Sequence, residues 1–157
     1  MEKVLIELSS LDKTNELAEV LMHSISFGRF YLSGELGSGK TTFVQFCMKA
    51  AGYTGKVTSP TFNLIKMYSL DGKTYYHIDA YRLSQAESVF DFEEALFSED
   101  VFCFVEWPEM IERFLDKNAI FIKFSVINNI HYCEISSPSP GYEPILQTLR
   151  RSFPCIH

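Results

Sequence analysis

The sequence predicts an α/β fold in which helices flank a central sheet of mixed parallel and antiparallel strands. Short apolar runs alternate with segments whose apolar residues recur at helical spacing, which is typical of strands connected by helices. The pair Asp71-Gly72 separates two strand-like segments and favours an antiparallel hairpin. A glycine-rich segment lies between an apolar strand and a helix. We expect residues 1–157 to form one domain, because this length is sufficient for one hydrophobic core.

In the first third of the chain, two strands each precede a helix. The first strand is predicted over residues 4–8, and Ser10 is suited to cap the helix that follows. The second strand is predicted over residues 30–33, and its helix over residues 42–51, with Gly52 as the stop signal. The first helix has an apolar stripe at helical spacing, formed by Leu11, Leu17, Ala18, Leu21 and Ile25.

The remainder of the chain contains two predicted hairpins and one buried strand. The continuous apolar run over residues 101–105 is typical of a central parallel strand. An acidic segment over residues 84–96 is predicted to be helical with a solvated face, and a short amphipathic helix is predicted over residues 142–151. The hairpin strands are predicted over residues 62–70 and 74–78, and over residues 118–127 and 130–135.

Residues 34–41 match the pattern G-x-x-x-x-G-K-[ST] and predict a phosphate-binding loop. Glycines allow backbone N–H groups to turn towards one anion. Lys40 adds a positive charge for the outer phosphates, and the Thr41 hydroxyl can reach Mg²⁺. We therefore expect a P-loop NTPase fold whose nucleotide contacts come from Gly34, Glu35, Leu36, Gly37, Ser38, Gly39, Lys40, Thr41 and Thr42.

A phosphate-binding loop also requires an acidic partner that holds Mg²⁺ and its waters opposite the phosphates. Glu106 directly follows the apolar run and is the stronger candidate for a metal ligand, together with Thr41. The alternative interpretation of Glu106 is a charge near the start of a helix that begins at Pro108. Asp79 closes the predicted strand over residues 74–78 and shares a strand face with His77, so this pair could orient a water molecule or a metal-bound ligand. The alternative interpretation of the pair is an exposed hydrophilic face of the hairpin. The catalytic candidates are thus Lys40, Asp79 and Glu106.

Thr61 and Trp107 are weaker candidates. Thr61 follows Pro60 in an irregular segment, where switch segments sense the terminal phosphate, although an ordinary turn explains it equally well. Trp107 is the only tryptophan and adjoins Glu106, so it could cover the nucleotide or face a partner, or belong to the core.

The composition bears on partners and location. The formal net charge is −6 and no basic cluster is visible, so we expect no binding to DNA and only indirect contact with RNA, through a partner. No apolar segment reaches the length of a membrane span, and acidic residues interrupt the N-terminal apolar run, which argues against a signal peptide. We therefore expect a cytoplasmic location.

The four cysteines form no C-x-x-C pair. Cys47 and Cys103 lie in apolar runs and are expected to be small core residues. The pairs His131-x-Cys133 and Cys155-x-His157 could in principle bind zinc, but their spacing is not typical of a zinc site, and a strand face followed by a frayed tail is the simpler interpretation.

Four segments together resemble the signature blocks of the TsaE family, the bacterial ATPases of tRNA threonylcarbamoyladenosine biosynthesis. The resemblance extends from about Val4 to Glu109, and it rests on order, spacing and length. The sequence departs from the family pattern in one stretch, Phe90-Asp91-Phe92-Glu93, where a glycine is common. The four blocks are Gly34 to Phe43, Thr58-Ser59-Pro60-Thr61-Phe62, His77-Ile78-Asp79-Ala80-Tyr81-Arg82-Leu83 and Glu106-Trp107-Pro108-Glu109.

The resemblance implies an ATPase that works with TsaD and TsaB, the proteins that transfer a threonylcarbamoyl group to an adenosine of tRNA. It implies that ATP and Mg²⁺ are the cofactors and that hydrolysis resets the complex between turnovers. By match, Lys40 would hold phosphates, Thr41 and Glu106 would hold Mg²⁺, and Asp79 would serve hydrolysis. The segment over residues 59–62 would act as a switch.

Two other functions remain open from the sequence. A small-molecule kinase usually has an arginine-bearing lid, but the arginines of this chain are not clustered near the loop. A GTP-dependent switch would require a guanine-reading pattern, and the sequence contains no N-K-x-D. The arginines are Arg29, Arg82, Arg113, Arg150 and Arg151.

Overall fold

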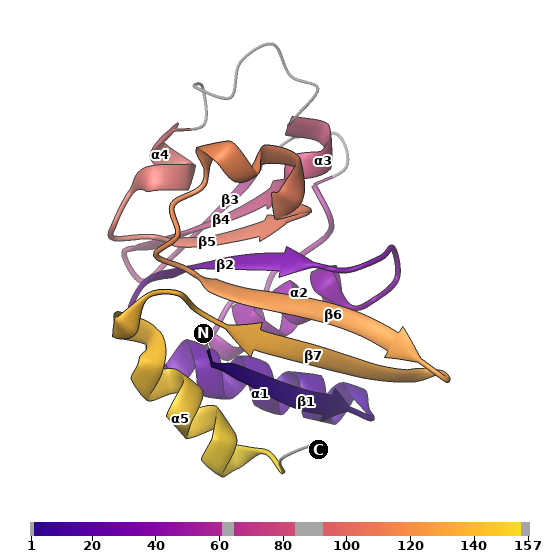
Figure 1. The fold of residues 1–157 in the computed structure, drawn as a ribbon. Coiled ribbons are helices and arrows are strands. Elements are labelled where there is room, and N and C mark those ends of the chain that lie inside the picture. The colour runs from indigo at the N-terminus through magenta and orange to yellow at the C-terminus, as the bar shows by residue number, and fades with distance from the viewer. Residues whose placement is uncertain (1, 61–64, 84–92, 155–157) are drawn as a thin grey trace.

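The computed structural model describes residues 2–60, 65–83 and 93–154, in which seven strands form one sheet (Figure 1). The strand order is β1-β7-β6-β2-β5-β4-β3. The strands are β1 (Lys3–Leu8), β2 (Gly28–Ser33), β3 (Ile65–Leu70), β4 (Lys73–Asp79), β5 (Phe102–Glu106), β6 (Ile120–Ile127) and β7 (Ile130–Ser136).

The predicted mixed sheet is confirmed. Strand β2 lies parallel to β5 and β6, and β4 lies parallel to β5. The pairs β3–β4, β6–β7 and β1–β7 are antiparallel. Both predicted hairpins form around turns with positive φ angles, at Asp71 (52°) and Gly72 (77°) and at Asn128 (53°) and Asn129 (65°). This backbone conformation matches the twist of paired strands, and it explains why these residue types mark the turns.

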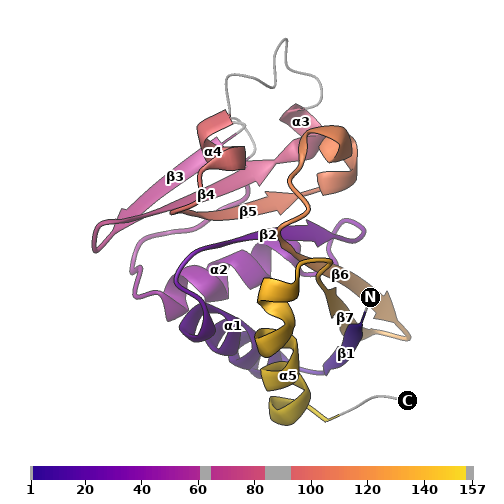
Figure 2. The ribbon, with the colours of Figure 1, turned by 60° about the vertical axis from the view of Figure 1, so that its left-hand side comes forward.

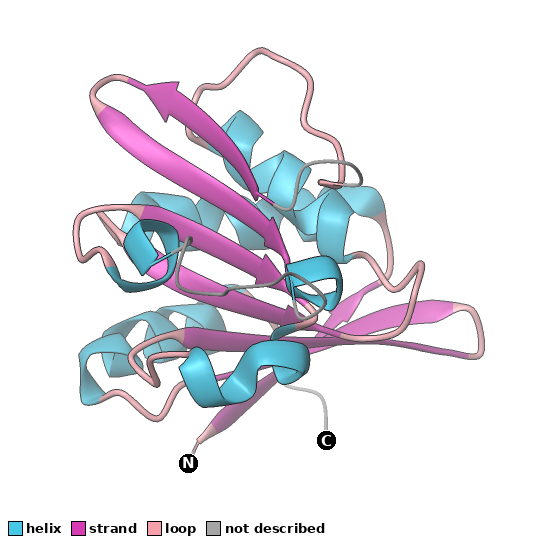
Figure 3. Cartoon of the chain, turned by 90° about the horizontal axis from the view of Figure 1, so that it is seen from above, coloured by secondary structure: helices cyan, strands magenta, loops and turns pink. Residues whose placement is uncertain are grey.

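Helices cover both faces of the sheet (Figures 2 and 3). Helices α1, α2 and α5 pack on one face, and α4 and the 3₁₀ helix η2 pack on the other. Helix α5 lies beside α1 and β1. The helices are α1 (Leu11–Ser24), α2 (Lys40–Ala50), α3 (Ala80–Leu83), α4 (Glu93–Phe97) and α5 (Glu143–Ser152), with 3₁₀ helices η2 (Pro108–Phe114) and η3 (Pro140–Tyr142).

Several predicted boundaries need correction. Helix α2 begins two residues earlier than predicted, at Lys40, because the loop before it ends at Gly39 with φ 115°. Strand β6 begins later than residue 118, since the Asn118 N–H donates to Asp116 Oδ1 at 2.9 Å within a turn. Tyr142 belongs to η3 and not to the final α-helix. The expected cap of α1 is confirmed, because the Ser10 side chain accepts from the Lys13 N–H. Residues 84–92 of the predicted acidic helix lie outside the described residues.

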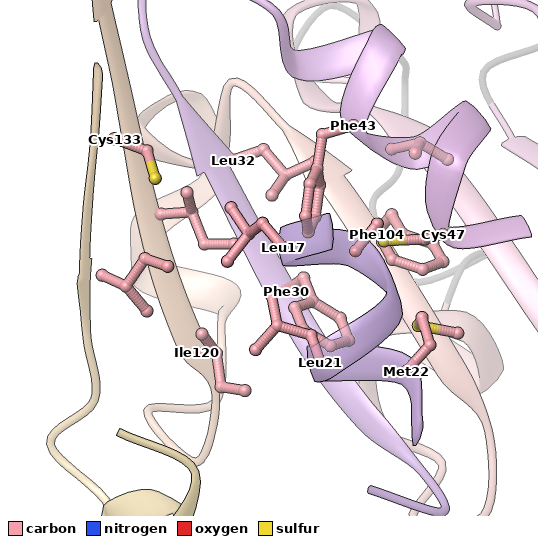
Figure 4. Close-up of a cluster of buried hydrophobic side chains, with 14 of the residues drawn as sticks. Leu17, Leu21, Met22, Phe30, Leu32, Phe43, Cys47, Phe104, Ile120 and Cys133 are labelled. Atoms are coloured by element: carbon pink, nitrogen blue, oxygen red, sulfur yellow. The ribbon is translucent and has the colours of Figure 1, made fainter. Parts of the chain in front are cut away.

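The larger core lies between the sheet and the α1–α2 layer (Figure 4). Phe30 is its centre and stacks on Phe104 of the neighbouring strand with ring centroids 5.2 Å apart. Cys47, Cys103 and Cys133 are fully buried and free, so the prediction that Cys47 and Cys103 are core residues is confirmed. Across the described ranges, no cluster of three or more histidine, cysteine or acidic side chains is arranged to bind a metal, and no helix is long and apolar enough to cross a membrane.

The parallel strands β2, β4 and β5 have their C-terminal ends at the same edge of the sheet. Strand β2 ends at Ser33, β4 at Asp79 and β5 at Glu106. The register places Asp79 level with Glu106, and Glu106 level with Leu32. Ligands of open α/β sheets bind at this carboxyl edge, and the glycine-rich loop leaves the sheet at the same place.

Candidate functional site

The glycine-rich loop connects β2 to α2 over residues 34–39 and depends on backbone conformations that favour glycine. Gly34 has φ 138°, and a Cβ atom at this position would lie 2.5 Å from the backbone oxygen of Phe124 in β6. The loop can therefore lie against β6 only without a side chain at residue 34. Gly39 then directs the chain into α2, so that the unpaired N–H groups of the first helical turn face the loop.

Lys40 lies beneath this loop and is only 4% exposed. Its ammonium donates to the carbonyl oxygens of Gly34 and Glu35 at 2.5 and 2.9 Å, and it lies 4.2 Å from the centre of the Trp107 ring. Burial lowers the pKa of Lys40, while the nearby carboxylates of Glu106 and other acidic residues oppose this shift. The lysine therefore places a positive charge beneath the loop, where it also lines the cavity.

Trp107 reaches Lys40 through an unusual backbone conformation. Its φ angle is 59°, which is uncommon for a bulky residue, and its N–H donates to the carbonyl of Leu32 at 3.2 Å. Its ring meets that of Tyr81 edge-on. Such conformations cluster at functional sites, and here the conformation turns the indole over the charged lysine and into the wall of the cavity.

The two predicted metal ligands, Thr41 and Glu106, contact each other. The Thr41 hydroxyl lies 3.0 Å from both carboxylate oxygens of Glu106. Glu106 is 5% exposed, and its Oε2 also lies 2.5 Å from Nε2 of His77. Sequence reasoning placed His77 and Asp79 on one strand face, but it gave no reason to expect the histidine to be buried against Glu106.

Asp79 lies at the end of β4 and lines the same cavity as Lys40 and Glu106. Its Oδ1 accepts from the N–H of Tyr81 at 3.1 Å, which supports the start of α3. Ser59, from the predicted switch segment, also lines the cavity. Thr61, the switch candidate itself, lies outside the described residues, as do residues 90–92 of the stretch that departs from the family pattern.

The cavity above the loop has a volume of about 700 Å³ and extends beyond the predicted residues. Part of this further lining comes from the end of β1 and the start of α1, and part from β6 and β7, where His131 pairs with Leu8. Leu11 was predicted to join the buried stripe of α1, but it is 66% exposed because it lies at the first turn, beside the cavity. The additional lining residues are Leu8, Ser9, Ser10, Leu11, Thr14, Phe124 and His131.

His131 is a residue of this site that the sequence did not predict. It had been considered only for zinc binding. The antiparallel pairing of β1 and β7 sets it opposite Leu8, and its Nδ1 lies 3.2 Å from the carbonyl oxygen of Ser38 in the loop. No local pattern indicates this contact, because residues 93 positions apart meet only through the strand register.

Comparison with known proteins identifies the family. Residues 8–132 match the family described as "Threonylcarbamoyl adenosine biosynthesis protein TsaE". The chain belongs to the TsaE family. The match spans the loop, both acidic candidates and His131, so every described residue of the candidate site lies within it.

Individual relatives agree with this assignment. The chain is 33% identical over 132 residues to "tRNA threonylcarbamoyladenosine biosynthesis protein TsaE" of Haemophilus influenzae, covering 82% of this chain and 84% of the relative. A protein of the same name from Rickettsia conorii is 35% identical over 133 residues, covering 82% and 75% of the two chains. The crystal structure of YdiB from Bacillus subtilis superposes with a TM-score of 0.79 at 24% identity and covers 96% of each chain, which supports the fold.

The site residues of this TsaE-family chain fit a phosphate chain and Mg²⁺. The hydroxyl of Ser38, which is 3% exposed, lies inside the loop without a hydrogen-bond partner among the residues that the structure describes. A buried donor of this kind is suited to an anion. The oxygen atoms of Thr41 and Glu106 are hard ligands, and Mg²⁺ typically takes only one or two protein ligands beside phosphate and water.

Proposed function

We propose that this chain is a Mg²⁺-dependent ATPase subunit that acts with TsaD and TsaB in tRNA threonylcarbamoyladenosine biosynthesis. Membership of the TsaE family supports the pathway. The contact between Thr41 and Glu106 at 3.0 Å, directly beside the loop lysine, is the main observation in support of a Mg²⁺-nucleotide site. The negative formal charge supports contact with tRNA only through the partners and argues against binding to DNA. We further propose that the chain acts as one cytoplasmic domain without a membrane role.

The proposed roles follow from the positions of the side chains. The backbone N–H groups of residues 34–42 bind the polyphosphate, and Lys40 places its charge at the outer phosphates. Thr41 and Glu106 hold Mg²⁺, which when bound neutralises charge between the phosphates. Asp79 orients the attacking water, because it lies at the same strand edge and lines the cavity.

The nucleoside part of ATP is proposed to occupy the remainder of the cavity. The apolar side chains of Leu8, Leu11 and Phe124 offer surfaces for a base, and Ser9, Ser10 and His131 offer polar atoms for a sugar or base edge. ATP is favoured over GTP because the guanine-reading pattern is missing from the sequence.

Hydrolysis by the isolated chain is proposed to be slow. None of the described residues that line the cavity is an arginine. Arginine fingers supply much of the charge stabilisation in related phosphoryl transfers, about 10³–10⁵ in rate. A partner that contributes a cation, or that orders the catalytic groups, would therefore raise turnover.

The test is phosphate release from ATP and GTP, measured for the chain alone and with TsaB and TsaD. We expect slow ATP turnover alone, a clear increase with both partners, and little turnover of GTP. Turnover that requires a metabolite acceptor would instead identify a small-molecule kinase. Nucleotide binding without turnover under every condition would reject the ATPase assignment.

A further inference from the structure

We propose that His77 is a positioning residue that fixes the carboxylate of Glu106 for metal binding. The inference rests on the proposed function, since it assumes that Glu106 is a metal ligand. The proposal gives a role to His77, a buried polar side chain that the sheet does not need in order to form. His77 is not among the residues that line the cavity, and it reaches the site through its contact with Glu106, which does line it.

The burial of the pair makes the contact specific. His77 is 0% exposed and Glu106 is 5% exposed, and the His77 Nε2 to Glu106 Oε2 distance is 2.5 Å. A carboxylate removed from water is costly unless its oxygens accept hydrogen bonds. His77 supplies one such bond from the protein interior, whereas Thr41 supplies the other from the side of the loop.

The geometry also identifies which imidazole nitrogen carries the proton. Nδ1 of His77 is buried and has no hydrogen-bond partner within the described ranges. A proton on Nδ1 would therefore be a buried donor without an acceptor, which costs about 1–3 kcal/mol. A proton on Nε2 points at a carboxylate oxygen. The arrangement therefore requires the tautomer in which Nε2–H donates to Glu106.

This bond gives the two carboxylate oxygens of Glu106 different roles in the proposal. His77 occupies Oε2 from one side and prevents the carboxylate from turning about its terminal bond. The Thr41 hydroxyl lies 3.0 Å from both carboxylate oxygens, so Oε1, with which His77 forms no hydrogen bond, is the oxygen left to face the metal. Partners that orient a metal ligand in this way typically change metal affinity or activity by about 10–100-fold when removed.

The strands hold the pair rigidly. His77 and Glu106 lie on adjacent parallel strands, β4 and β5, whose register sets His77 level with Phe104 and Asp79 level with Glu106. The glutamate side chain thus leans back along the sheet towards the histidine. Both strands have a neighbouring strand on each side, so the orientation of Oε1 depends on the sheet and not on a loop.

The experiment compares His77→Phe, His77→Gln and His77→Asn. Phenylalanine fills the space but has no donor. The glutamine amide nitrogen lies the same number of bonds from Cβ as Nε2 of histidine, whereas the asparagine nitrogen lies one bond closer. For each variant, titration calorimetry gives the affinity for ADP with and without Mg²⁺, and the measured quantity is the ratio of the two affinities.

We expect His77→Phe and His77→Asn to retain the metal-free affinity for ADP but to lose about 10–100-fold of the gain that Mg²⁺ provides. His77→Gln should recover most of that gain. A purely structural role would change both affinities together and would not distinguish Gln from Asn. A folded His77→Phe protein with the wild-type ratio would overturn the proposal.

A spectroscopic measurement tests the proposal in the wild-type protein even if a variant fails to fold. Long-range ¹H–¹⁵N correlation spectra report which nitrogen of each histidine is protonated, and we expect protonated Nε2 for His77. A proton found on Nδ1 alone would refute the positioning bond. Failure of the proposed function has a different signature: wild-type protein that shows this tautomer but binds no ADP, with or without Mg²⁺.

Discussion

Replacement of Gly34 by alanine should destabilise the chain far more than the same replacement at Gly37, although both glycines belong to one loop. At Gly34 the backbone has φ 138°, and the new Cβ would lie 2.5 Å from the Phe124 backbone oxygen and 2.6 Å from Ser38 Oγ. The serine can rotate, but the backbone oxygen belongs to β6 and cannot move alone. The strained backbone costs about 1–3 kcal/mol, and the forced contact adds about 1–3 kcal/mol.

We therefore expect Gly34→Ala to lower the free energy of unfolding by about 4 kcal/mol, in the middle of the summed range. For a domain of this length the melting temperature should fall by roughly 8–16 °C. Gly37→Ala is the matched control, because Gly37 has φ 79° and nothing lies within 4 Å of the added Cβ. Only the left-handed backbone then opposes alanine, at about 1–2 kcal/mol.

Urea denaturation monitored by circular dichroism gives both free energies, and calorimetric titration with MgADP gives the accompanying loss of affinity. The two variants must differ in stability by about 2 kcal/mol or more for the reasoning to hold. Equal free energies of unfolding would show that β6 can move away from the added Cβ at little energetic cost. The close approach of Gly34 to Phe124 would then have no structural importance.

Three further predictions concern other parts of the chain. Lys40→Met should weaken the affinity for ADP both with and without Mg²⁺, whereas Glu106→Gln should weaken only the gain in affinity that Mg²⁺ provides. Titration calorimetry that shows the same pattern of affinity loss in both variants would contradict the division of roles. Arg29→Met should lower the free energy of unfolding by about 3 kcal/mol. The buried guanidinium donates to the carbonyl oxygens of Leu96 and Ser98, at 2.7 and 2.5 Å, and the variant loses both bonds. A urea midpoint within error of that of the wild type would refute this. Burial raises the pKa of Cys103 and of Cys133 to about 12, so both thiols should stay unreactive towards a thiol reagent at pH 8 until the protein is denatured; mass spectrometry would detect native labelling at either position.

Local patterns in the sequence were sufficient for the loop and its immediate partners. The glycine spacing around Lys40 reflects backbone angles that few other residues adopt, so it can be recognised without knowledge of the fold. Glu106 was placed correctly at a strand end, because a continuous apolar run followed by a charged residue marks both the strand and its carboxyl edge. Both hairpin turns were predicted for the same reason, since Asp-Gly and Asn-Asn pairs suit positive φ angles.

The rest of the site depends on strand pairing between distant segments. The sequence placed His77 on a polar strand face, yet the parallel pairing of β4 with β5 buries it against Glu106. The wall at Leu8 and His131 forms only because β1 adds to the sheet beside β7. Periodicity identifies strands but not their neighbours or register, so these contacts required the three-dimensional arrangement.

Lys40 holds the loop in the structure and has a second, proposed role towards phosphate, and the two have different physical requirements. An ammonium group has three N–H donors, and two of them are directed at the carbonyl oxygens of Gly34 and Glu35. One donor remains for a phosphate oxygen unless the loop releases the others. The lysine therefore holds the loop in shape as well as contributing charge, and the planar guanidinium of arginine would satisfy the charge without reproducing the two compact bonds to the loop. Because two of its three donors are directed at the loop, the proposed function assigns a large share of phosphate recognition to the backbone N–H groups and to Mg²⁺ held by Thr41 and Glu106. The buried bond from His77 would act on the metal-dependent share.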